Sequence, residues 1–272
     1  MSESKTAALR PFRFLKAVRE KGPLVHNITN YVVMNSTANA LLAAGASPAM
    51  VHAVEEVEEF TSISSALVVN IGTLSAPWVQ AMHLAARQAA DSSIPWVLDP
   101  VGVGATRFRT ETAASLMAHR PTVVRGNASE IMVVAGAVGS AGKGVDSTQD
   151  SHSAVDPARA LALESGSIVA MTGAVDYVTD GARTVAIRNG DPMMGRVTGL
   201  GCTASALVGA FLAAGDDAFN ATVAALATLG VAGELAAAVS PGPGSLQLHI
   251  LDLLHTMDED VLDGRASVSV VS

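Results

Sequence analysis

The chain has 272 residues, of which 49% are hydrophobic and 4% aromatic, and its formal net charge is −8. The length allows one large α/β domain or two ordinary ones, and the negative charge argues against a nucleic-acid partner, which would need a basic face. The single cysteine excludes an internal disulfide and a multi-cysteine metal site. The N-terminal stretch MSESKTAALRPFRFLKAVRE lacks the apolar core of a signal peptide, so we expect a cytoplasmic protein that is not bound to a membrane.

The first half of the chain alternates strand and helix patterns, and glycines, prolines or polar clusters separate them. Residues 66–71, ALVVNI, form a continuous apolar run before Gly72, as in a strand that is buried on both faces. Gly45 is expected to be the C-cap of the helix that precedes it. The expected elements are a helix at 12–21, a strand at 24–25, a helix at 32–44, a short strand or its approach at 47–51, a glutamate-rich helical face at 55–60, a strand at 66–71 and a helix at 76–91.

The same alternation continues toward the C-terminus, where strands are expected at 96–98, 121–124 and 167–171, with a hairpin of 177–179 and 184–188 around Asp180-Gly181. The longest apolar stretch, residues 203–239, is broken at 215–217 and predicts two buried alanine-rich helices rather than membrane spans. Recurring strand-helix-strand units predict an α/β fold with a mostly parallel sheet covered by helices on both faces. We expect one domain over residues 1–272, with residues 1–21 as an N-terminal extension and helix.

Residues 139–153 are rich in Gly, Ser and Asp, and they predict a mobile surface loop. Within them, Gly142-Lys143-Gly144 resembles part of a phosphate-binding P-loop. That motif needs a glycine where Ala137 stands and a Ser or Thr where Gly144 stands, so the P-loop is excluded. A nucleotide would have to bind through another architecture.

Polar residues gather where the expected strands end: Asn27, within the cluster HNITN, then Asp99, Arg125 and Thr172. In a doubly wound sheet the carboxyl ends of the strands share one edge, and ligands bind there. Each residue also has a plain structural interpretation, because Asn and Thr are common in turns and caps and an Asp before a proline is common in turns. The convergence of these residues at one edge favours a binding site.

Asn127 and Glu130 lie three residues apart at an expected helix start, so they share a face. Together with Asp99 they suit a hydrated Mg²⁺, which takes one or two carboxylates and substrate phosphates. Arg125 is placed to hold phosphate oxygens. The alternative is a capping box, in which Asn127 caps the helix and Glu130 is its partner.

Gly199, Gly201 and Cys202 stand immediately before a long apolar helix, in the segment RVTGLGCTASALVGAFL. A helix start leaves backbone N–H groups unpaired and carries a partial positive charge, so it can bind an anion. The same position is expected to stabilise a Cys202 thiolate and lower the thiol pKa. A tight turn into the helix is the competing interpretation.

Several segments, in order, resemble the hydroxyethylthiazole kinase family of thiamine salvage. The match runs from about residue 22 to 255 and is carried by HNITNYVVMNSTAN, GASPAMV, LVVNIGTL, DPVGVGAT, VRGNASEI, VTGLGC and GPGSLQ. The resemblance implies a ribokinase-like fold, ATP with Mg²⁺, and phosphorylation of the hydroxyl of 4-methyl-5-(2-hydroxyethyl)thiazole. It also implies a homotrimer with substrate sites between subunits.

The resemblance assigns roles to individual residues. Met50 and Gly199 would contact the thiazole, and we expect Asn27 to bind it as well. Arg125, Thr172 and Asn127 would contact the nucleotide. Glu130 would hold the metal together with Asp99, since residues 127–130 match the fold's Asn-x-x-Glu motif. Gly199, Gly201 and Cys202 correspond to its Gly-x-Gly-Asp loop and would be catalytic. Cys202 stands where most ribokinase-like relatives have an aspartate base, which leaves the identity of the base open.

Three other functions remain open at this stage. One is another ribokinase-like enzyme, such as a hydroxymethylpyrimidine kinase or an ATP-dependent hydrate dehydratase, which would be expected to have aspartate at position 202. Another is a binding module that holds a phosphorylated ligand without turnover, although such a module would not need a catalytic metal pair. The third is an enzyme with Cys202 as nucleophile and His26 as its base.

Overall fold

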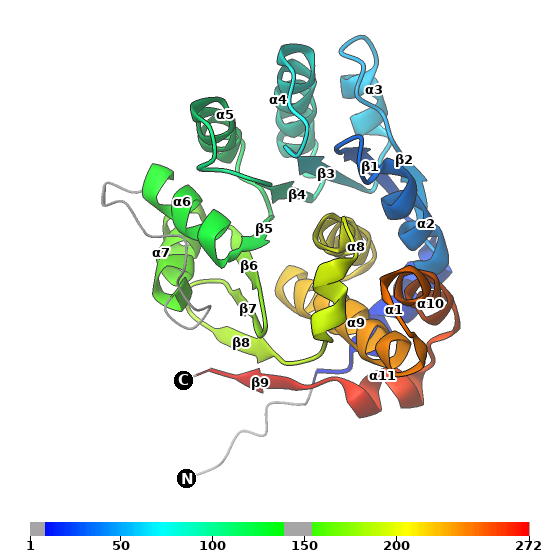
Figure 1. Cartoon of the computed structure of the whole chain (residues 1–272). Helices are drawn as coiled ribbons and strands as arrows, with labels where there is room; N and C mark the ends of the chain where they lie inside the picture. Colours follow the sequence, from blue (N-terminus) through cyan, green and yellow to red (C-terminus); the bar gives the residue numbers. More distant parts are fainter. Residues whose placement is uncertain (1–8, 139–153, 272) are drawn as a thin grey trace.

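The computed structural model describes residues 9–138 and 154–271 (Figure 1). The loop expected at residues 139–153, with its Gly142-Lys143-Gly144 segment, and the first eight residues of the N-terminal extension lie outside the described residues. All the helices and strands that the sequence predicts fall within the described residues.

A nine-stranded sheet runs through the molecule in the order β2-β1-β3-β4-β5-β6-β7-β8-β9. Neighbouring strands from β2 to β6 are parallel, and β6 to β9 pair antiparallel. The sheet is mostly parallel, as predicted. The strands are β1 (Leu24–Ile28), β2 (Ser47–Ala49), β3 (Ala66–Asn70), β4 (Trp96–Asp99), β5 (Val123–Asn127), β6 (Ile168–Thr172), β7 (Asp176–Thr179), β8 (Thr184–Ile187) and β9 (Val268–Val270).

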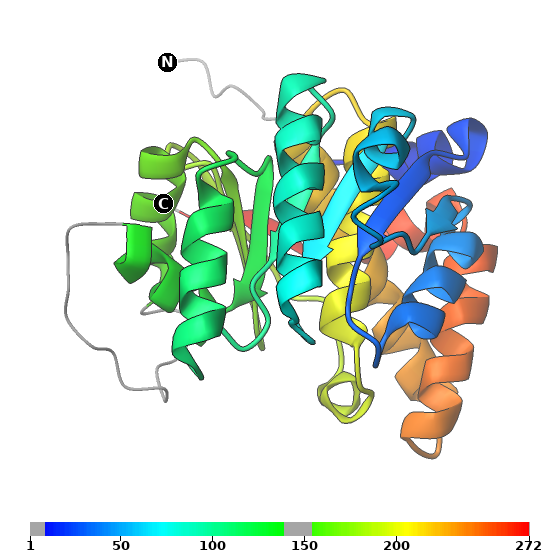
Figure 2. The same cartoon turned by 90° about the horizontal axis from the view of Figure 1, so that it is seen from above.

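Helices cover both faces of this sheet, which confirms the predicted α/β layers (Figures 1 and 2). On one face are α3 (Val57–Ser62), α4 (Ala76–Asp91), α5 (Arg107–Met117), α6 (Ala128–Val138) and α7 (Val155–Ser165). On the other face, inside the curve of the sheet, are α8 (Leu200–Ala214) and α9 (Ala218–Val239), with α1 (Pro11–Lys21), α2 (Met34–Ala44), α10 (Pro243–Thr256) and α11 (Glu259–Arg265) packed around them. A 3-10 helix, η2 (Pro192–Arg196), leads into α8.

Each face of the sheet has its own apolar core, because side chains alternate along every strand. Val25 and Val68 point toward α8 and α9, whereas Leu67 and Val69 point toward α4. The helix α9 is long and apolar enough to cross a membrane, but 72% of that stretch is buried in the protein. Helices α8 and α9 are thus the two buried alanine-rich helices that the sequence predicts.

Most element boundaries agree with the sequence prediction to within a few residues. Gly45 ends α2 in the left-handed conformation, with φ of 97°, as expected of a C-cap. The hairpin of β7 and β8 is also present. The sequence analysis assigned no range to the helices α5, α7, α10 and α11. It also missed β9, a short strand that pairs with β8 at the edge of the sheet. Strands β4 and β5 run on through Asp99 and Asn127, so these polar residues belong to the strands themselves.

Candidate active site

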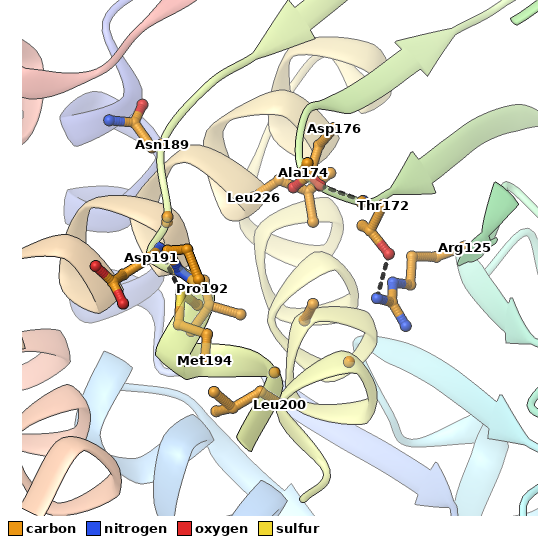
Figure 3. Close-up of a pocket in the computed structure, with 17 residues that line it drawn as sticks. Arg125, Thr172, Ala174, Asp176, Asn189, Asp191, Pro192, Met194, Leu200 and Leu226 are labelled. Carbon is orange, nitrogen blue, oxygen red and sulfur yellow. Dashed lines mark hydrogen bonds between the residues drawn. The ribbon is translucent and has the colours of Figure 1, made fainter. Parts of the chain in front are cut away.

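A pocket of about 480 Å³ opens at the carboxyl ends of β5 and β6, between η2 and the start of α8 (Figure 3). Arg125 and Thr172 lie on one side of it, and Asp191, Pro192 and Met194 lie across from them. Of the sequence-predicted residues, Arg125, Thr172 and Gly201 line this pocket. The parallel topology brings them together, because consecutive parallel strands end at the same edge.

Arg125 is the main cation of the pocket, and it is only 9% exposed. Its Nη2 donates a hydrogen bond to the hydroxyl of Thr172. Its Nη1 lies 3.9 Å from Oδ1 of Asp99, and its Nε has no hydrogen-bond partner. A guanidinium with unused donors at the wall of a pocket can bind phosphate oxygens.

The opposite wall of the pocket is held in place from α9. Glu234 accepts hydrogen bonds from Nδ2 of Asn189 and, at 3.0 Å, from the backbone N–H of Gly190. Asn189 also accepts the N–H of Ser267, next to β9, at 2.6 Å. The Asn189 amide is therefore occupied by structural bonds, and the surface that this wall offers to a ligand comes mostly from Pro192, Met194 and the backbone.

Asp99 is completely buried beneath the pocket edge. Its Oδ2 accepts hydrogen bonds from Asn70 at 2.7 Å and from Ser205 at 2.8 Å, while its Oδ1 has no hydrogen-bond partner. Burial raises the pKa of Asp99 to about 6, against the opposing effect of the Arg125 charge. The unpartnered Oδ1, close to Arg125, marks this carboxylate as available to a further positive group.

The start of α8 has the geometry that its glycines predict. Gly199 is the N-cap and has φ of 82°, in the left-handed region that favours glycine. A Cβ at Gly201 would lie 2.8 Å from Nη1 of Arg125, so only glycine lets the guanidinium approach the helix start this closely. The first N–H groups of α8 have no partner within the helix. The helix start and Arg125 together form a corner that can bind an anion, which we call the anion-binding corner.

Cys202 lies in the first turn of α8, as predicted, but its ionisation differs from the expectation. Burial, and then the charge of Asp99, raise the pKa of the Cys202 thiol to about 11, although hydrogen bonds from Asn70 and Asn30 oppose the rise. The expected low thiol pKa is wrong, because desolvation outweighs the effect of the helix start. The group at this position is a neutral thiol near pH 7.

Asn127 and Glu130 form a reciprocal capping box at the start of α6. The side chain of Asn127 accepts the N–H of Glu130 at 2.9 Å, and Oε2 of Glu130 accepts the N–H of Asn127 at 2.9 Å. The other oxygen, Oε1, accepts the N–H of Gly102 at 2.8 Å. Glu130 thus joins α6 to the loop after β4, while Asn127 does not line the pocket. The capping box is therefore present, and each carboxylate oxygen of Glu130 keeps one lone pair for a further contact.

His26 does not lie near Cys202, so the proposed Cys202–His26 pair is wrong. Because Val25 points toward α8, the next side chain points to the opposite face, where His26 packs edge-on against Phe60 at 5.2 Å between ring centroids. Its Nε2 donates to the carbonyl of Val51 at 2.8 Å. Burial lowers the pKa of His26 to about 4.

Asn27 and Met50 lie at the β1–β2 side of the same sheet edge. The Nδ2 of Asn27 donates to the carbonyls of Val25 and Ala49, at 2.9 and 3.4 Å, and its buried Oδ1 has no partner. Met50 follows β2 directly and is half-buried. Neither residue lines the pocket near Arg125, so they belong to a different part of the edge.

Sequence reasoning missed three polar residues of this edge: Asn70, Asp176 and Asn189. Asn70 is the last residue of β3, and its position resembles that of Asp99 in β4. Asp176 begins β7 and lines the pocket, where burial raises its pKa to about 6 against the hydrogen bond from Gly173. A polar residue at the end of an apolar strand was the available signal for Asn70.

Comparison with known proteins decides the family. The model of the Hydroxyethylthiazole kinase family matches residues 15–260. The chain belongs to this family. It is 58% identical to the hydroxyethylthiazole kinase of Rhizobium etli over 257 residues, covering 94% of this chain and 99% of the relative. It is 55% identical to that of Syntrophus aciditrophicus, with 93% and 94% covered. This kinase is therefore an enzyme, which excludes the pure binding module.

Solved structures confirm the ribokinase-like fold. A hydroxyethylthiazole kinase from Pyrococcus horikoshii OT3 superposes with a TM-score of 0.90 and 45% identity, over 96% of this chain and 99% of that one. Pyridoxal kinase from Staphylococcus aureus in complex with ADP gives a TM-score of 0.63 at 16% identity, over 92% and 99% of the two chains. The second match supports the fold alone.

Proposed function

We propose that this kinase transfers the γ-phosphoryl group of ATP to the hydroxyl of 4-methyl-5-(2-hydroxyethyl)thiazole, as a step of thiamine salvage in the cytoplasm. The observation that carries the proposal is the anion-binding corner of Arg125 and the start of α8 in a chain that is 58% identical to a hydroxyethylthiazole kinase. In the transfer, the bond from the γ-phosphorus to its bridging oxygen breaks, the hydroxyl oxygen bonds to that phosphorus, and the hydroxyl proton leaves.

The pocket suits ATP with its phosphates at Arg125 and Gly201 and its base toward Pro192 and Met194. At one end, Arg125 and the backbone of α8 supply positive charge and N–H donors. Thr172, which now accepts a hydrogen bond from Arg125, would help to hold the nucleotide. Phosphoryl transfer depends mainly on positioning and on charge stabilisation, and this corner provides both.

The residues beside the corner fit Mg²⁺. Asp99 Oδ1 is buried without a hydrogen-bond partner, and Glu130 lies close enough to raise the pKa of Asp99. Magnesium takes one or two carboxylates and completes its shell with water and substrate phosphates, so two carboxylates from the protein are enough. Asp99 and Glu130 would hold it, with Asn127 beside them. When bound, Mg²⁺ would neutralise charge on the phosphates.

The thiazole would bind beyond the corner, near Met50, Asn27 and Gly199. The unpartnered Oδ1 of Asn27 offers an acceptor there, and half-buried Met50 offers apolar surface. Cys202 would stand next to the reacting hydroxyl. A neutral thiol is a weak base, but a loose transition state places little charge on the attacking oxygen, so a strong base is not required.

We also propose one kinase domain that assembles as a homotrimer with thiazole sites between subunits. A single sheet that includes strands from both ends of the described chain supports one domain. Exposed apolar side chains support assembly. Leu42 on α2 is 58% exposed, Leu248 on the adjoining α10 is 59% exposed, and Val239 at the end of α9 is 64% exposed.

A coupled assay of ADP release tests the acceptor. The thiazole alcohol and a hydroxymethylpyrimidine are compared under the same conditions with ATP and Mg²⁺. We expect the thiazole alcohol to be the much better substrate. Preference for the pyrimidine would instead identify a hydroxymethylpyrimidine kinase, and turnover of neither would contradict the proposed reaction.

A further inference from the structure

We propose that Asn30 and Asn70 are positioning residues that form a chain of amide hydrogen bonds from Asp99 to the sulfur of Cys202 and hold that sulfur as a hydrogen-bond acceptor. Their connection to turnover rests on the proposed function of Cys202. The chain joins the ends of β1, β3 and β4 to the start of α8, beneath the reacting edge.

The backbone fixes the orientation of the Asn70 amide. The N–H of Gly72 lies 2.9 Å from the Asn70 oxygen and can only donate. The same oxygen also accepts Nδ2 of Asn30, at 2.9 Å. The Asn70 nitrogen must then point the other way, where it donates to Asp99 Oδ2 at 2.7 Å and also faces the Cys202 thiol. Every hydrogen bond of this amide has one allowed direction.

The same argument fixes Asn30. Its oxygen accepts the N–H of Val32 at 3.1 Å, so its nitrogen faces Asn70 and Cys202. One amide hydrogen goes to Asn70, and the other goes to Sγ of Cys202 at 3.5 Å. Asn30 is 4% exposed, and its Nδ2 lies 2.6 Å from where a Cβ on Gly72 would be. The side chain therefore has little space in which to rotate.

The sulfur of Cys202 consequently accepts a hydrogen bond from the protein side. The charged groups that act on it are Asp99 and Arg125, and they oppose each other. Amide N–H groups that donate to the sulfur favour a developing negative charge on it. They also leave the S–H proton free to point away from Asn30. The chain thus presents the sulfur in one orientation at the start of α8.

Because the protein has one cysteine, its S–H stretching band in the Raman spectrum reports Cys202 alone. Asn30→Ala removes the donor to the sulfur. Asn30→Asp keeps the shape and the acceptor for Val32 but, when ionised, removes the same donor without leaving a cavity. We expect both variants to shift the S–H band. Iodoacetamide alkylation is expected to slow by about tenfold in Asn30→Asp, the variant without a cavity, because a hydrogen bond to a charged group is lost.

Asn70→Ala should shift the band in the same direction, because Asn70 orients the Asn30 amide and also acts on the Cys202 thiol itself, so the Asn30→Ala/Asn70→Ala double variant should shift the band at least as far as either single variant. If Asn70→Ala does not fold, Asn30→Asp carries the test. The matched control is Asn39→Ala, an exposed asparagine whose side chain donates to Asn35 within α2. Cys202→Ser confirms the band assignment.

Unchanged bands and alkylation rates in both Asn30 variants would overturn the proposal. Kinetic measurements distinguish the positioning of the Cys202 sulfur from the proposed function of Cys202 in the transfer. If Cys202 assists the transfer, kcat should fall by about tenfold with a smaller change in KM for the thiazole alcohol. A shifted band with unchanged kcat would support the positioning of the sulfur and contradict a role for Cys202 in the transfer.

Discussion

Cys202 is subject to opposing effects: burial and Asp99 favour its neutral thiol, and the amides of Asn30 and Asn70 favour its thiolate. Asp99 lies in a similar balance, since burial favours the neutral acid while Arg125 favours the charged form. Glu130 combines a helix cap with a proposed metal site. At the scale of single residues, each of these side chains is therefore subject to two competing demands that substitution can separate.

The first prediction separates the roles of Cys202. We expect Cys202→Ala to keep measurable turnover below that of the wild type. Cys202→Asp should stay active or gain activity. An ionised carboxylate, which the helix start favours, can accept the proton of the hydroxyl, whereas a thiol whose pKa is about 11 is neutral near pH 7. Turnover is measured with ATP and Mg²⁺. Wild-type activity in the alanine variant would exclude the base role, and two inactive but folded variants would show that the thiol has another specific function.

The second prediction concerns Glu130. Glu130→Gln should fold and lose most turnover, since it removes a proposed metal carboxylate. The amide can keep only one of the hydrogen bonds from Asn127 and Gly102, so the stability should also fall by about 0.5–2 kcal/mol. Thermal unfolding and turnover are measured together. Normal turnover in a less stable variant would reduce Glu130 to a helix cap.

At the scale of elements, the site depends on how α8 begins. Gly199 in the left-handed conformation turns the chain from η2 into α8, and Gly201 admits Arg125 beside the first turn. The same helix packs on β1, β3 and β4, which fixes the relative positions of the polar strand ends. Any change in the entry to α8 should therefore affect stability and activity together.

The third prediction tests this entry. Gly199→Ala should destabilise the protein by at least about 1–2 kcal/mol, the cost of the left-handed conformation for a residue with a Cβ. That Cβ would also lie 2.5 Å from Cγ1 of Val33. Turnover should fall with stability. The control is Gly244→Ala in α10, where a Cβ has no neighbour within 4 Å. Equal unfolding midpoints for the two variants would contradict the prediction.

At the scale of the whole molecule, two apolar cores enclose the sheet, and buried polar groups make their stability depend on pH. His26 is the clearest case, because it is completely buried and is held by Val51 and Thr61. The folded protein favours its neutral form. An unfolded chain binds a proton at the ordinary histidine pKa near 6.5, so acid favours unfolding.

The fourth prediction follows from that balance. Stability contributed by neutral His26 should be complete above pH 6.5 and should be lost as the pH falls toward 4, by up to about 3 kcal/mol. In His26→Gln this part of the pH dependence should disappear, as measured by denaturant unfolding between those pH values. His255→Gln, at an exposed histidine, is the control. An unchanged acid dependence in His26→Gln would contradict the assignment.

The fifth prediction concerns assembly. We expect a homotrimer by light scattering at assay concentration, and Leu248→Glu, which places a charge on an exposed apolar side chain of α10, should weaken it. Turnover should fall with dissociation if thiazole sites lie between subunits. A fully active monomeric wild-type protein would exclude the proposed assembly.

The sequence by itself determined the layers and the polar edge of the sheet. Apolar runs that end in Asn27, Asp99, Arg125 and Thr172 predict parallel strands with a polar edge, and these patterns are local. The glycines before α8 likewise require only local backbone geometry. Strand β9 was not predicted, because its three residues are too few to show a strand pattern without β8 beside them.

Only the tertiary structure decided the chemistry of the side chains. The sequence placed Cys202 at a helix start and predicted an acidic thiol, but burial next to Asp99 reversed that expectation. It placed His26 near the site, yet the alternation of β1 turns that side chain to the opposite face. Burial, electrostatic neighbours and hydrogen-bond direction arise between segments that lie far apart along the chain. The hydrogen-bond chain from Asn30 through Asn70 to Asp99 could therefore be inferred only from the folded structure.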